Sequence, residues 1–240
     1  MGVSGKEEAG ARAPKPPAER LYGRTRGKTL RARQSRLLAH TLPRLLFPGA
    51  AAAEPRSAFS HPREIWFEVG FGGGEHAQAL ADAEPEIGLI ACEVFENGIC
   101  SLLSRLVPEG KEETAPVPAN LRLWPDDARL LLRQFPDASL SKLFLMFPDP
   151  WPKARHAKRR FVHPDQIPLV ARVLATGGEW RIASDDPTYQ QWVAGVLEAQ
   201  HMFDGTTPVA ARPRGWPPTR YEAKALREGR QPLYWSLRRR

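Results

Sequence analysis

Carboxylates lie at or just beyond the ends of four apolar runs in this chain, and their placement suggests a ligand site. The acids are Glu68, Glu93, the neighbouring pair Asp126 and Asp127, and Asp149. A carboxylate accepts hydrogen bonds and attracts positive charge. We therefore expect a ligand that carries hydroxyl, amino or cationic groups.

A glycine-rich turn follows the first apolar run, in the sequence EVGFGGGEH of residues 68–76. Gly70, Gly72 and Gly74 let the backbone turn tightly and approach a ligand closely. The turn follows a predicted strand and opens a predicted helix, as nucleotide-binding loops do. Because Glu68 and Glu75 flank the glycines, a pyrophosphate would fit poorly, whereas the sulfonium and ammonium groups of S-adenosylmethionine would fit well. A purely structural glycine turn is the alternative.

The next acids lie where they could bind the ribose and the adenine of such a cofactor. Glu93 ends the second run, roughly 20 residues beyond the glycines, where an acid commonly accepts hydrogen bonds from both ribose hydroxyls. Asp126 or Asp127 follows the third run, where it can accept from an adenine amino group or cap the next helix. Both tasks and both aspartates stay open at this point.

The fourth run leads into the sequence PDPWPKARHAKRR of residues 148–160. Proline fixes its own backbone angle and biases the preceding residue away from helix, so Asp149 is held in an extended turn. Trp151 offers a ring face for stacking on a base, although it can equally be a core residue. The positive charge that follows is dense enough for phosphate contacts and predicts salt-sensitive nucleic-acid binding. The residues are Lys153, Arg155, His156, Lys158, Arg159 and Arg160.

Polar residues in the last quarter of the chain complete the candidate site. Asp185 follows the fifth apolar run, where it can face a ligand or cap the helix predicted to begin near Pro187. Thr219 and Glu222 have the spacing of a capping box, and they can alternatively present polar groups to a substrate. A functional role for these residues therefore competes with ordinary helix capping.

Positioning these side chains requires a scaffold, and the apolar pattern predicts an α/β fold. Strands are predicted over residues 64–70, 87–94, 120–124, 142–147 and 178–184, with an edge strand over 232–237. Helices are predicted over residues 76–83, 97–106, 128–134, 164–174 and 187–199. Nearly continuous apolar strands that alternate with helices imply a doubly wound, mostly parallel sheet with helices on both faces. Such sheets bind ligands beyond the carboxyl ends of their strands.

Composition narrows the choice of partner. The 240 residues carry a formal net charge of +8, which suggests an acidic partner, most simply nucleic acid, or else a basic solvated surface. Two cysteines, Cys92 and Cys100, without a Cys/His cluster indicate neither a disulfide framework nor a metal site. No apolar run approaches about 18 residues, so we expect a cytoplasmic protein without a membrane segment.

The chain divides into three parts by composition. Residues 1–20 are rich in alanine, proline, glycine and charge, which predicts a disordered tail. Residues 21–60 are expected to form a basic extension, and leucines such as Leu37 and Leu45 predict that it docks on the body. Residues 61–240 are expected to form the catalytic domain.

The order of EVGFGGGEH, Glu93, FPDPWPKARHAKRR, ASDDP and PPTRYEAKALREG resembles that of the bacterial tRNA (guanine-N7-)-methyltransferase family. The resemblance covers about residues 64–237, and its most specific part is PDPW with the basic residues after it. It implies a Rossmann-like class I methyltransferase fold and S-adenosylmethionine as the cofactor. It further implies methyl transfer to N7 of a guanine in the variable loop of tRNA.

The resemblance also assigns tasks to individual residues. Cofactor-side positions are matched by Glu68, Glu93, Asp127 and Asp149, and Asp149 matches the family's proposed catalytic residue. Substrate-side positions are matched by Lys153, Asp185, Thr219, Arg220, Tyr221 and Glu222, and RNA-contacting positions by residues 155–160. Whether Asp149 acts on the guanine, the cofactor or both stays open, as does the choice between a monomer and a homodimer.

Three other classes of protein compete with this interpretation. The Asp-Pro-Trp turn resembles the Asp-Pro-Pro-aromatic turn of enzymes that methylate exocyclic amines, which would allow a DNA or protein substrate. An oxidoreductase is less compatible, because the chain has no Tyr-x-x-x-Lys pair. A non-catalytic RNA-binding module would explain the charge and leave the acids at the strand ends without a task.

Overall fold

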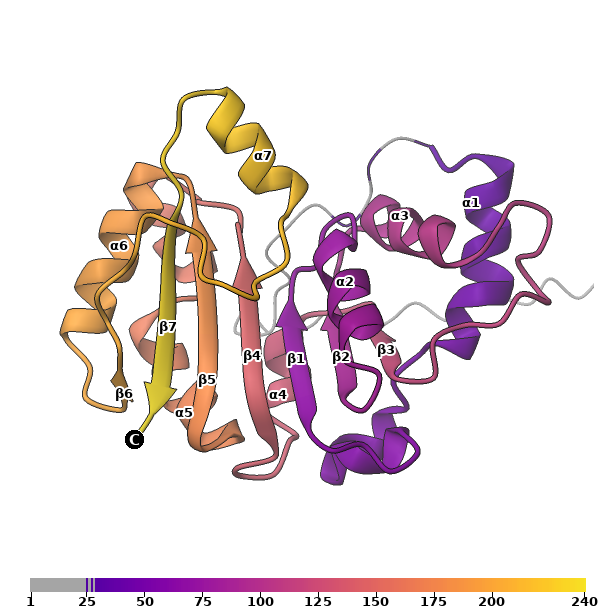
Figure 1. Ribbon diagram of the computed structural model, residues 1–240, viewed down its shortest axis with the longest axis horizontal. Coiled ribbons are helices and arrows are strands. Elements are labelled where there is room, and N and C mark those ends of the chain that lie inside the picture. Colours follow the sequence, from indigo (N-terminus) through magenta and orange to yellow (C-terminus); the bar gives the residue numbers. More distant parts are fainter. Residues whose placement is uncertain (1–24, 26, 28) are drawn as a thin grey trace, which may run out of the picture.

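The computed structural model describes residues 25, 27 and 29–240 of the chain. A seven-stranded sheet runs through it in the order β3-β2-β1-β4-β5-β7-β6 (Figure 1). The strands are β1 (Ile65–Val69), β2 (Gly88–Cys92), β3 (Leu121–Trp124), β4 (Leu140–Met146), β5 (Leu174–Ser184), β6 (Phe203–Asp204) and β7 (Leu233–Arg239). β1 to β5 pair in parallel, and β7 runs antiparallel between β5 and β6. The predicted doubly wound, mostly parallel α/β fold is confirmed.

Helices cover both faces of the sheet (Figure 1). They are α1 (Ala32–Arg36), α2 (Glu75–Ala83), α3 (Glu96–Leu106), α4 (Ala128–Leu132), α5 (Ile167–Val173), α6 (Pro187–Glu198) and α7 (Arg220–Arg227). Side chains of α2 and α3 pack on one face with Trp66 and Phe144, whereas α4, α5 and α6 pack on the other face around Phe67 and Trp180. Because β1 and β2 are covered on both sides, β2 is apolar throughout and β1 is apolar except at Glu68.

The carboxyl-terminal part of the sheet differs from the prediction in two respects. β5 begins at Leu174, immediately after α5, so it includes residues that were expected to lie outside any strand. The strand predicted over residues 232–237 is confirmed as β7, but it does not lie at the edge of the sheet, because β6 pairs with its outer side. β6 has only two residues, which is too short for an alternating apolar pattern to reveal it.

The N-terminal extension packs beside β3. After α1 the chain forms a π-helical turn (Leu37–Thr41), and Leu37 and Leu45 are buried, as expected. Backbone hydrogen bonds then join Leu45 and Phe47 to Leu123 of β3. The extension therefore continues the sheet by one short bridge beyond its β3 edge.

Part of the positive charge of the extension is used within the protein. The Nε atoms of Arg33 and Arg36 lie 3.4 and 3.6 Å from the carboxylate oxygens of Glu112. Arg44 donates hydrogen bonds to the carbonyls of Glu113 and Ala115 at 3.0 and 2.6 Å. These arginines attach the extension to the loop of residues 107–119. The predicted tail of residues 1–20 lies outside the described residues, and the domain boundary at residue 60 stays a prediction.

Three further features concern the described residues as a set. None of their helices is long and apolar enough to cross a membrane. The same residues contain no group of three or more His, Cys, Asp or Glu side chains arranged to hold a metal ion. Cys92 and Cys100 are buried free thiols.

Candidate active site

The acids predicted from the sequence lie along one edge of the sheet, because β3, β2, β1 and β4 are parallel neighbours. In that order, Asp127 follows β3, Glu93 follows β2, Glu68 lies near the end of β1, and Asp149 follows β4. Neighbouring strands are about 4.8 Å apart, so four strands span roughly 15 Å. The strand order reverses between β1 and β4, which is where doubly wound sheets bind their ligands.

The thiol of Cys92, the last residue of β2, shows how closely these acids gather. Burial raises the pKa of Cys92 well above its ordinary range, and the negative charges of Asp127, Glu93 and Glu68 raise it further. A charge shifts a neighbouring pKa appreciably only over short distances. The acids from three different strands therefore surround one point at the end of β2.

The glycine-rich turn has backbone angles that suit glycine. Gly70, Gly72 and Gly74 have φ angles of +71°, +58° and +81°. A Cβ atom on Gly74 would lie 2.5 Å from the side chain of Leu102, so a larger residue would also collide with α3. A Cβ atom on Gly70 would have no heavy atom within 4 Å, apart from those of its chain neighbours. The turn thus leaves open space next to its backbone.

Gly98 allows the first turn of α3 to approach this glycine-rich turn. A Cβ atom on Gly98 would lie 2.4 Å from the carbonyl oxygen of Gly72. We expect Gly98→Ala to destabilise the fold by about 1–3 kcal/mol, because backbone must move to relieve the overlap. The displaced turn should weaken binding of the cofactor predicted from the sequence about tenfold, or ~1.4 kcal/mol. Thermal denaturation and calorimetric titration measure the two effects.

Gly195→Ala in α6 is the matched control for this substitution. A Cβ atom on Gly195 meets no atom within 4 Å, and alanine is the better helix former. We expect this variant to be as stable as the wild type or slightly more stable, with unchanged cofactor affinity. Equal losses in both variants would contradict the role assigned to Gly98.

Glu93 is held by backbone N–H groups on both sides. Its Oε2 accepts a hydrogen bond from Gly72 at 2.7 Å, and its Oε1 accepts from Val94 and Phe95 at 2.8 and 2.9 Å. Burial raises the pKa of Glu93, the three hydrogen bonds oppose the rise, and the charge of Asp149 adds to it. The effect of Asp149 places its carboxylate within electrostatic reach of Glu93.

Binding of the cofactor predicted from the sequence is expected to weaken in mild acid, because the pKa of Glu93 lies above the ordinary carboxyl value of 4.5. Protonation removes acceptor capacity, so kcat/KM for the cofactor should fall as pH decreases through this raised pKa. The stability effect has the opposite sign. Since protonation favours the folded state, ionised Glu93 lowers stability at neutral pH; this cost diminishes as pH falls through the raised folded pKa and is gone below the ordinary value of 4.5.

Parallel pH series of kcat/KM for the wild type and Glu93→Gln measure this effect. We expect the glutamine variant to have weaker cofactor binding throughout and to lose the acid limb. If the acid limb persists unchanged in Glu93→Gln, another group is responsible for the titration.

Glu68 pairs with a histidine that the sequence analysis did not single out. Nδ1 of His76, in the first turn of α2, lies 3.1 Å from Oε1 of Glu68, an ion-pair distance without hydrogen-bond alignment. Both side chains are buried, and the ring of His76 meets Phe144 edge-on. Oε2 of Glu68 is buried with no hydrogen-bond partner among the described residues. A buried oxygen in this state requires a donor from a ligand or a water molecule.

Asp127 performs the capping role that the sequence left open. Its Oδ1 accepts from the backbone N–H of Arg129 at 2.9 Å and so caps α4. The side chain of Arg129 also binds this carboxylate, with Nη2 2.5 Å from Oδ2. Asp126 accepts from the backbone N–H of Asp127 at 2.8 Å. Because Nε of Arg129 also donates to both oxygens, this carboxylate is already bound within the protein, and the assignment of Asp127 to the cofactor stays a prediction.

The turn after β4 keeps Asp149 accessible. Asp149 is exposed and makes no hydrogen bond or ion pair with any described residue. Phe147 and Trp151, on either side of residues 148–150, have φ angles of +53° and +45°. Such angles cost about 1–3 kcal/mol each outside glycine and concentrate at functional sites. The surrounding structure must therefore hold the turn in this shape.

Arg160 differs from its predicted role as an RNA contact. Its guanidinium is buried and donates from Nε to the carbonyl of Pro150 at 3.1 Å and from Nη2 to the carbonyl of Trp151 at 3.0 Å. The same group stacks over the ring of Trp192 at 4.6 Å. Because both carbonyls belong to the turn that carries Asp149, Arg160 clamps this turn.

The other basic residues of this stretch lie in a short 3₁₀ segment (Ala154–Arg159), except for Lys153, which directly precedes it. Trp151 meets His156 edge-on with ring centroids 5.8 Å apart, and the guanidinium of Arg159 lies 4.7 Å from its ring centroid. Part of the surface of Trp151 is therefore covered within the protein. The exposed basic side chains of this stretch are Lys153, Arg155 and Lys158.

Asp185 and Asp186 have separate tasks at the end of β5. Asp186 caps α6, since its Oδ1 accepts from the backbone N–H of Tyr189 at 2.8 Å. Asp185 lies 2.9 Å from Nη1 of Arg230, which follows α7. This ion pair joins the end of β5 to the end of α7, and sequence patterns could not predict it because the partners are far apart in the chain.

Thr219 begins α7, which the sequence had indicated only through its capping box. Oγ1 of Thr219 accepts from the backbone N–H of Glu222 at 3.1 Å. The side chain of Glu222 does not complete the box and is bound instead by Arg212 and Tyr234. Both partners were missed at the sequence level, since neither has the spacing of a helical neighbour.

The start of α7 reaches the glycine-rich turn. Nε of Arg220 lies 3.6 Å from Oε1 of Glu75, which Arg105 also binds at 2.6 Å. The hydroxyl of Tyr221 would be 2.9 Å from a Cβ atom on Gly72. The predicted substrate-side helix thus lies directly beside the predicted cofactor turn.

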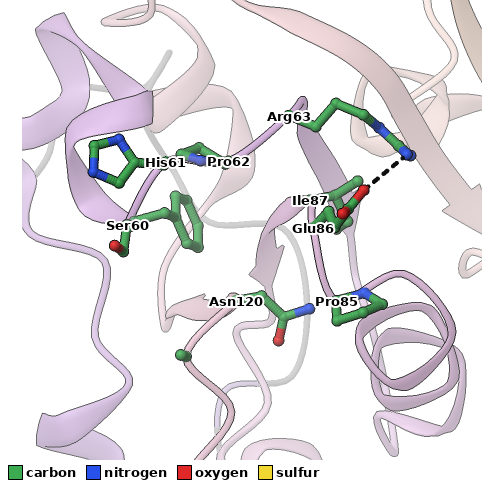
Figure 2. A pocket seen from close by; sticks show the side chains of 10 residues that line it. Ser60, His61, Pro62, Arg63, Pro85, Glu86, Ile87 and Asn120 are labelled. Carbon is green, nitrogen blue, oxygen red and sulfur yellow. Dashed lines mark hydrogen bonds and ion pairs between the residues drawn. The ribbon is translucent and has the colours of Figure 1, made fainter.

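A cavity of about 430 Å³ lies at the opposite edge of the sheet, before β1 and β2 begin (Figure 2). Figure 2 shows Arg63 pointing toward Glu86, with which it pairs at 3.3 Å. Asn120, also in its lining, donates to the carbonyls of Ala81 and Glu84. None of the predicted site residues lines this cavity, so the candidate chemistry lies at the other edge.

Comparison with known proteins gives sequence matches along most of the chain. A family model described as "Putative methyltransferase" matches residues 62–234. The tRNA (guanine-N(7)-)-methyltransferase of Granulibacter bethesdensis is 62% identical over 223 residues, which cover 92% of this chain and 96% of that protein. The tRNA (guanine-N(7)-)-methyltransferase of Rhodospirillum rubrum is 46% identical over 239 residues, which cover 95% and 91% of the two chains.

Solved structures with little sequence similarity share the fold. The 16S rRNA methyltransferase KamB has a TM-score of 0.53 at 15% identity, over 77% of this chain and 92% of that chain. An antibiotic-related methyltransferase has a TM-score of 0.54 at 10% identity with the same coverage. The sheet order and these neighbours identify a class I, Rossmann-like methyltransferase fold. With sequence matches this long and this similar, the chain belongs to the tRNA (guanine-N(7)-)-methyltransferase family.

Proposed function

We propose that this protein transfers a methyl group from S-adenosylmethionine to N7 of a guanine in tRNA. The observation that carries the proposal is the row of carboxylates at the ends of β3, β2, β1 and β4, with an exposed and unpaired Asp149 at the switch point. Family membership supports the same reaction. The proposed target lies in the variable loop, and the proposed compartment is the cytoplasm, where tRNA is used.

The residues around the glycine-rich turn fit S-adenosylmethionine. Glu68 has a buried oxygen without a donor, which suits a cationic amino group at this end of β1. Glu93 uses three of about four lone-pair sites for backbone contacts, so it can still accept from a ribose hydroxyl. The residues proposed to hold or admit the cofactor are Glu68, Gly70, Gly72, Gly74, Glu93, Asp127 and Asp149.

The chemistry proposed for Asp149 is electrostatic. Guanine N7 has an in-plane lone pair and serves as a hydrogen-bond acceptor, so no base has to deprotonate it before attack. Bound S-adenosylmethionine supplies the methyl group as an electrophile. The guanine gains positive charge during transfer, and a nearby carboxylate stabilises that charge. Correct placement of the two reactants supplies the remainder of the rate.

Binding of the tRNA is proposed to use the surface next to this turn. Exposed positive charge attracts phosphates and makes affinity depend on salt. The proposed phosphate contacts are Arg155 and Lys158, with His156 and Arg159 beside them, and Lys153 is proposed to lie on the substrate side. Asp185 and the residues Thr219, Arg220, Tyr221 and Glu222 are proposed to lie around the target base.

Incubation of bulk tRNA with methyl-labelled S-adenosylmethionine, followed by mapping of the labelled nucleotide, tests the proposed function. We expect N7-methylguanosine at one position in the variable loop. A transcript with 7-deazaguanosine at that position should accept no label, because a carbon replaces the acceptor nitrogen. Label on an exocyclic amine, on DNA or on protein would contradict the proposal.

A further inference from the structure

A buried hydrogen-bond network holds the carboxylate of Glu222. The hydroxyl of Tyr234 donates to Oε1 of Glu222 at 2.8 Å, and Nε of Arg212 donates to the same oxygen at 3.0 Å. Nη1 of Arg212 donates to the carbonyl of Trp216 at 2.6 Å, which fixes the guanidinium. No described residue donates a hydrogen bond to the other oxygen, Oε2.

Burial makes the orientation of this network specific. Glu222 is 8% exposed and Tyr234 is 2% exposed. A buried carboxylate is costly unless it is paired, and here the guanidinium of Arg212 and the hydroxyl of Tyr234 offset that cost with hydrogen bonds. Burial raises the pKa of Tyr234, and its hydrogen bond to Glu222 raises it further, so the phenol stays a donor at neutral pH.

Tyr234 also contacts the turn that carries Asp149. Its ring meets Phe147 edge-on at 6.4 Å, and Phe147 begins this turn with its left-handed backbone angle. On its other side the ring meets Trp216 edge-on at 5.9 Å. One side chain of β7 therefore touches both a residue of α7 and the turn after β4.

We propose that Tyr234 and Arg212 are positioning residues that orient Glu222 so that its free oxygen accepts hydrogen bonds from the target guanine. The donors would be the N1–H and the 2-amino group of the base. A carboxylate accepts and does not donate, so it suits guanine and disfavours adenine, which has no N1–H. This inference rests on the proposed function and adds to it two residues that set base specificity.

The test compares the wild type with Tyr234→Phe and Arg212→Lys on two tRNA transcripts, which carry guanosine or inosine at the target. Inosine keeps N7 and N1–H and lacks the 2-amino group. We expect the wild type to prefer guanosine by at least about tenfold in kcat/KM. Tyr234→Phe should lower kcat/KM for guanosine about tenfold and reduce this preference. The Kd for tRNA should change less than about twofold, because phosphate contacts dominate it.

Tyr189→Phe is the matched control. Tyr189 is also fully buried, and its hydroxyl accepts a hydrogen bond from the backbone of Val162, on the other face of the sheet. This variant should keep the wild-type ratio of guanosine to inosine. Arg212→Lys keeps the charge and loses the fork geometry, so it should lie between the wild type and Tyr234→Phe.

A merely structural role for Tyr234 would lower Tm and leave the guanosine-to-inosine ratio at its wild-type value. That result, or an unchanged kcat/KM in Tyr234→Phe, would overturn the inference. Failure of the wild type to form N7-methylguanosine would instead overturn the proposed function, so the two failures are distinguishable.

Discussion

Asp149→Asn is expected to lower kcat for tRNA methylation by roughly 10²–10³-fold, the usual cost of removing one electrostatic contact from a developing charge. The substitution keeps the size of the side chain and one acceptor oxygen and removes the negative charge. Because Asp149 is exposed and unpaired among the described residues, the free energy of unfolding should change by less than about 0.5 kcal/mol. Single-turnover rates at saturating tRNA, together with Tm, measure these effects.

Binding measurements on the same variant separate the possible tasks of Asp149. The Kd for tRNA should stay within about twofold, since a carboxylate makes no favourable contact with phosphate. Glu109→Gln, in the exposed loop of residues 107–119, removes the same charge and should leave kcat unchanged. A near-normal kcat in Asp149→Asn would rule out the electrostatic role. A raised KM for S-adenosylmethionine with a normal kcat would assign Asp149 to cofactor binding alone.

The position of Asp149 could be predicted because two simple rules act together. Continuous apolar runs, such as β2 and residues 143–146 of β4, identify strands that are covered on both faces, and parallel strands end at the same edge. Acids that follow such runs must therefore gather there, as Glu93, Asp127 and Asp149 do. The sequence predicted this gathering without any knowledge of the loops.

The contacts of individual polar side chains were not predictable in this way. Arg160 belongs to a run of basic residues, and nothing local distinguishes it from Arg155. Its burial results from Trp192 on α6 and from the carbonyl groups of the turn, which approach only in the folded chain. The density of charge along the sequence therefore could not show which of these basic side chains face outward.

The neighbours of Glu222 illustrate a second reason why side-chain contacts could not be predicted from the sequence. Thr219 and Glu222 have the spacing of a capping box, and half of it forms. The carboxylate of Glu222 is drawn instead to Arg212 and Tyr234, because their combined hydrogen bonds are stronger than one bond to a backbone N–H. Local spacing therefore predicts where the helix begins, whereas long-range pairing determines what its side chains do.

Arg160→Ala is expected to lower kcat by roughly 10²-fold, because the turn that carries Asp149 loses its clamp. Two carbonyl groups, those of Pro150 and Trp151, lose charge-assisted partners, at a cost of about 1–3 kcal/mol in stability. The left-handed angle of Trp151 is then free to relax. Arg160→Lys keeps the charge without the fork that reaches both carbonyls, so its kcat should be intermediate. Steady-state kinetics and denaturant titration provide the measurements.

The salt dependence of tRNA binding distinguishes this clamp from a phosphate contact. Arg155 and Lys158 are exposed, so replacing either by alanine should reduce the slope of log Kd against log salt by about 0.7–0.9 and leave kcat at saturating tRNA unchanged. Arg160→Ala should show the reverse pattern, with the wild-type slope and a low kcat, since a buried guanidinium releases no counterion on binding.

If Arg160→Ala instead lowers the slope as Arg155→Ala does, Arg160 contacts the phosphate backbone and the clamping role is wrong. The variants should be compared at several salt concentrations with one tRNA preparation. The slope does not depend on the fraction of active protein, so differences in protein stability between the variants do not affect it.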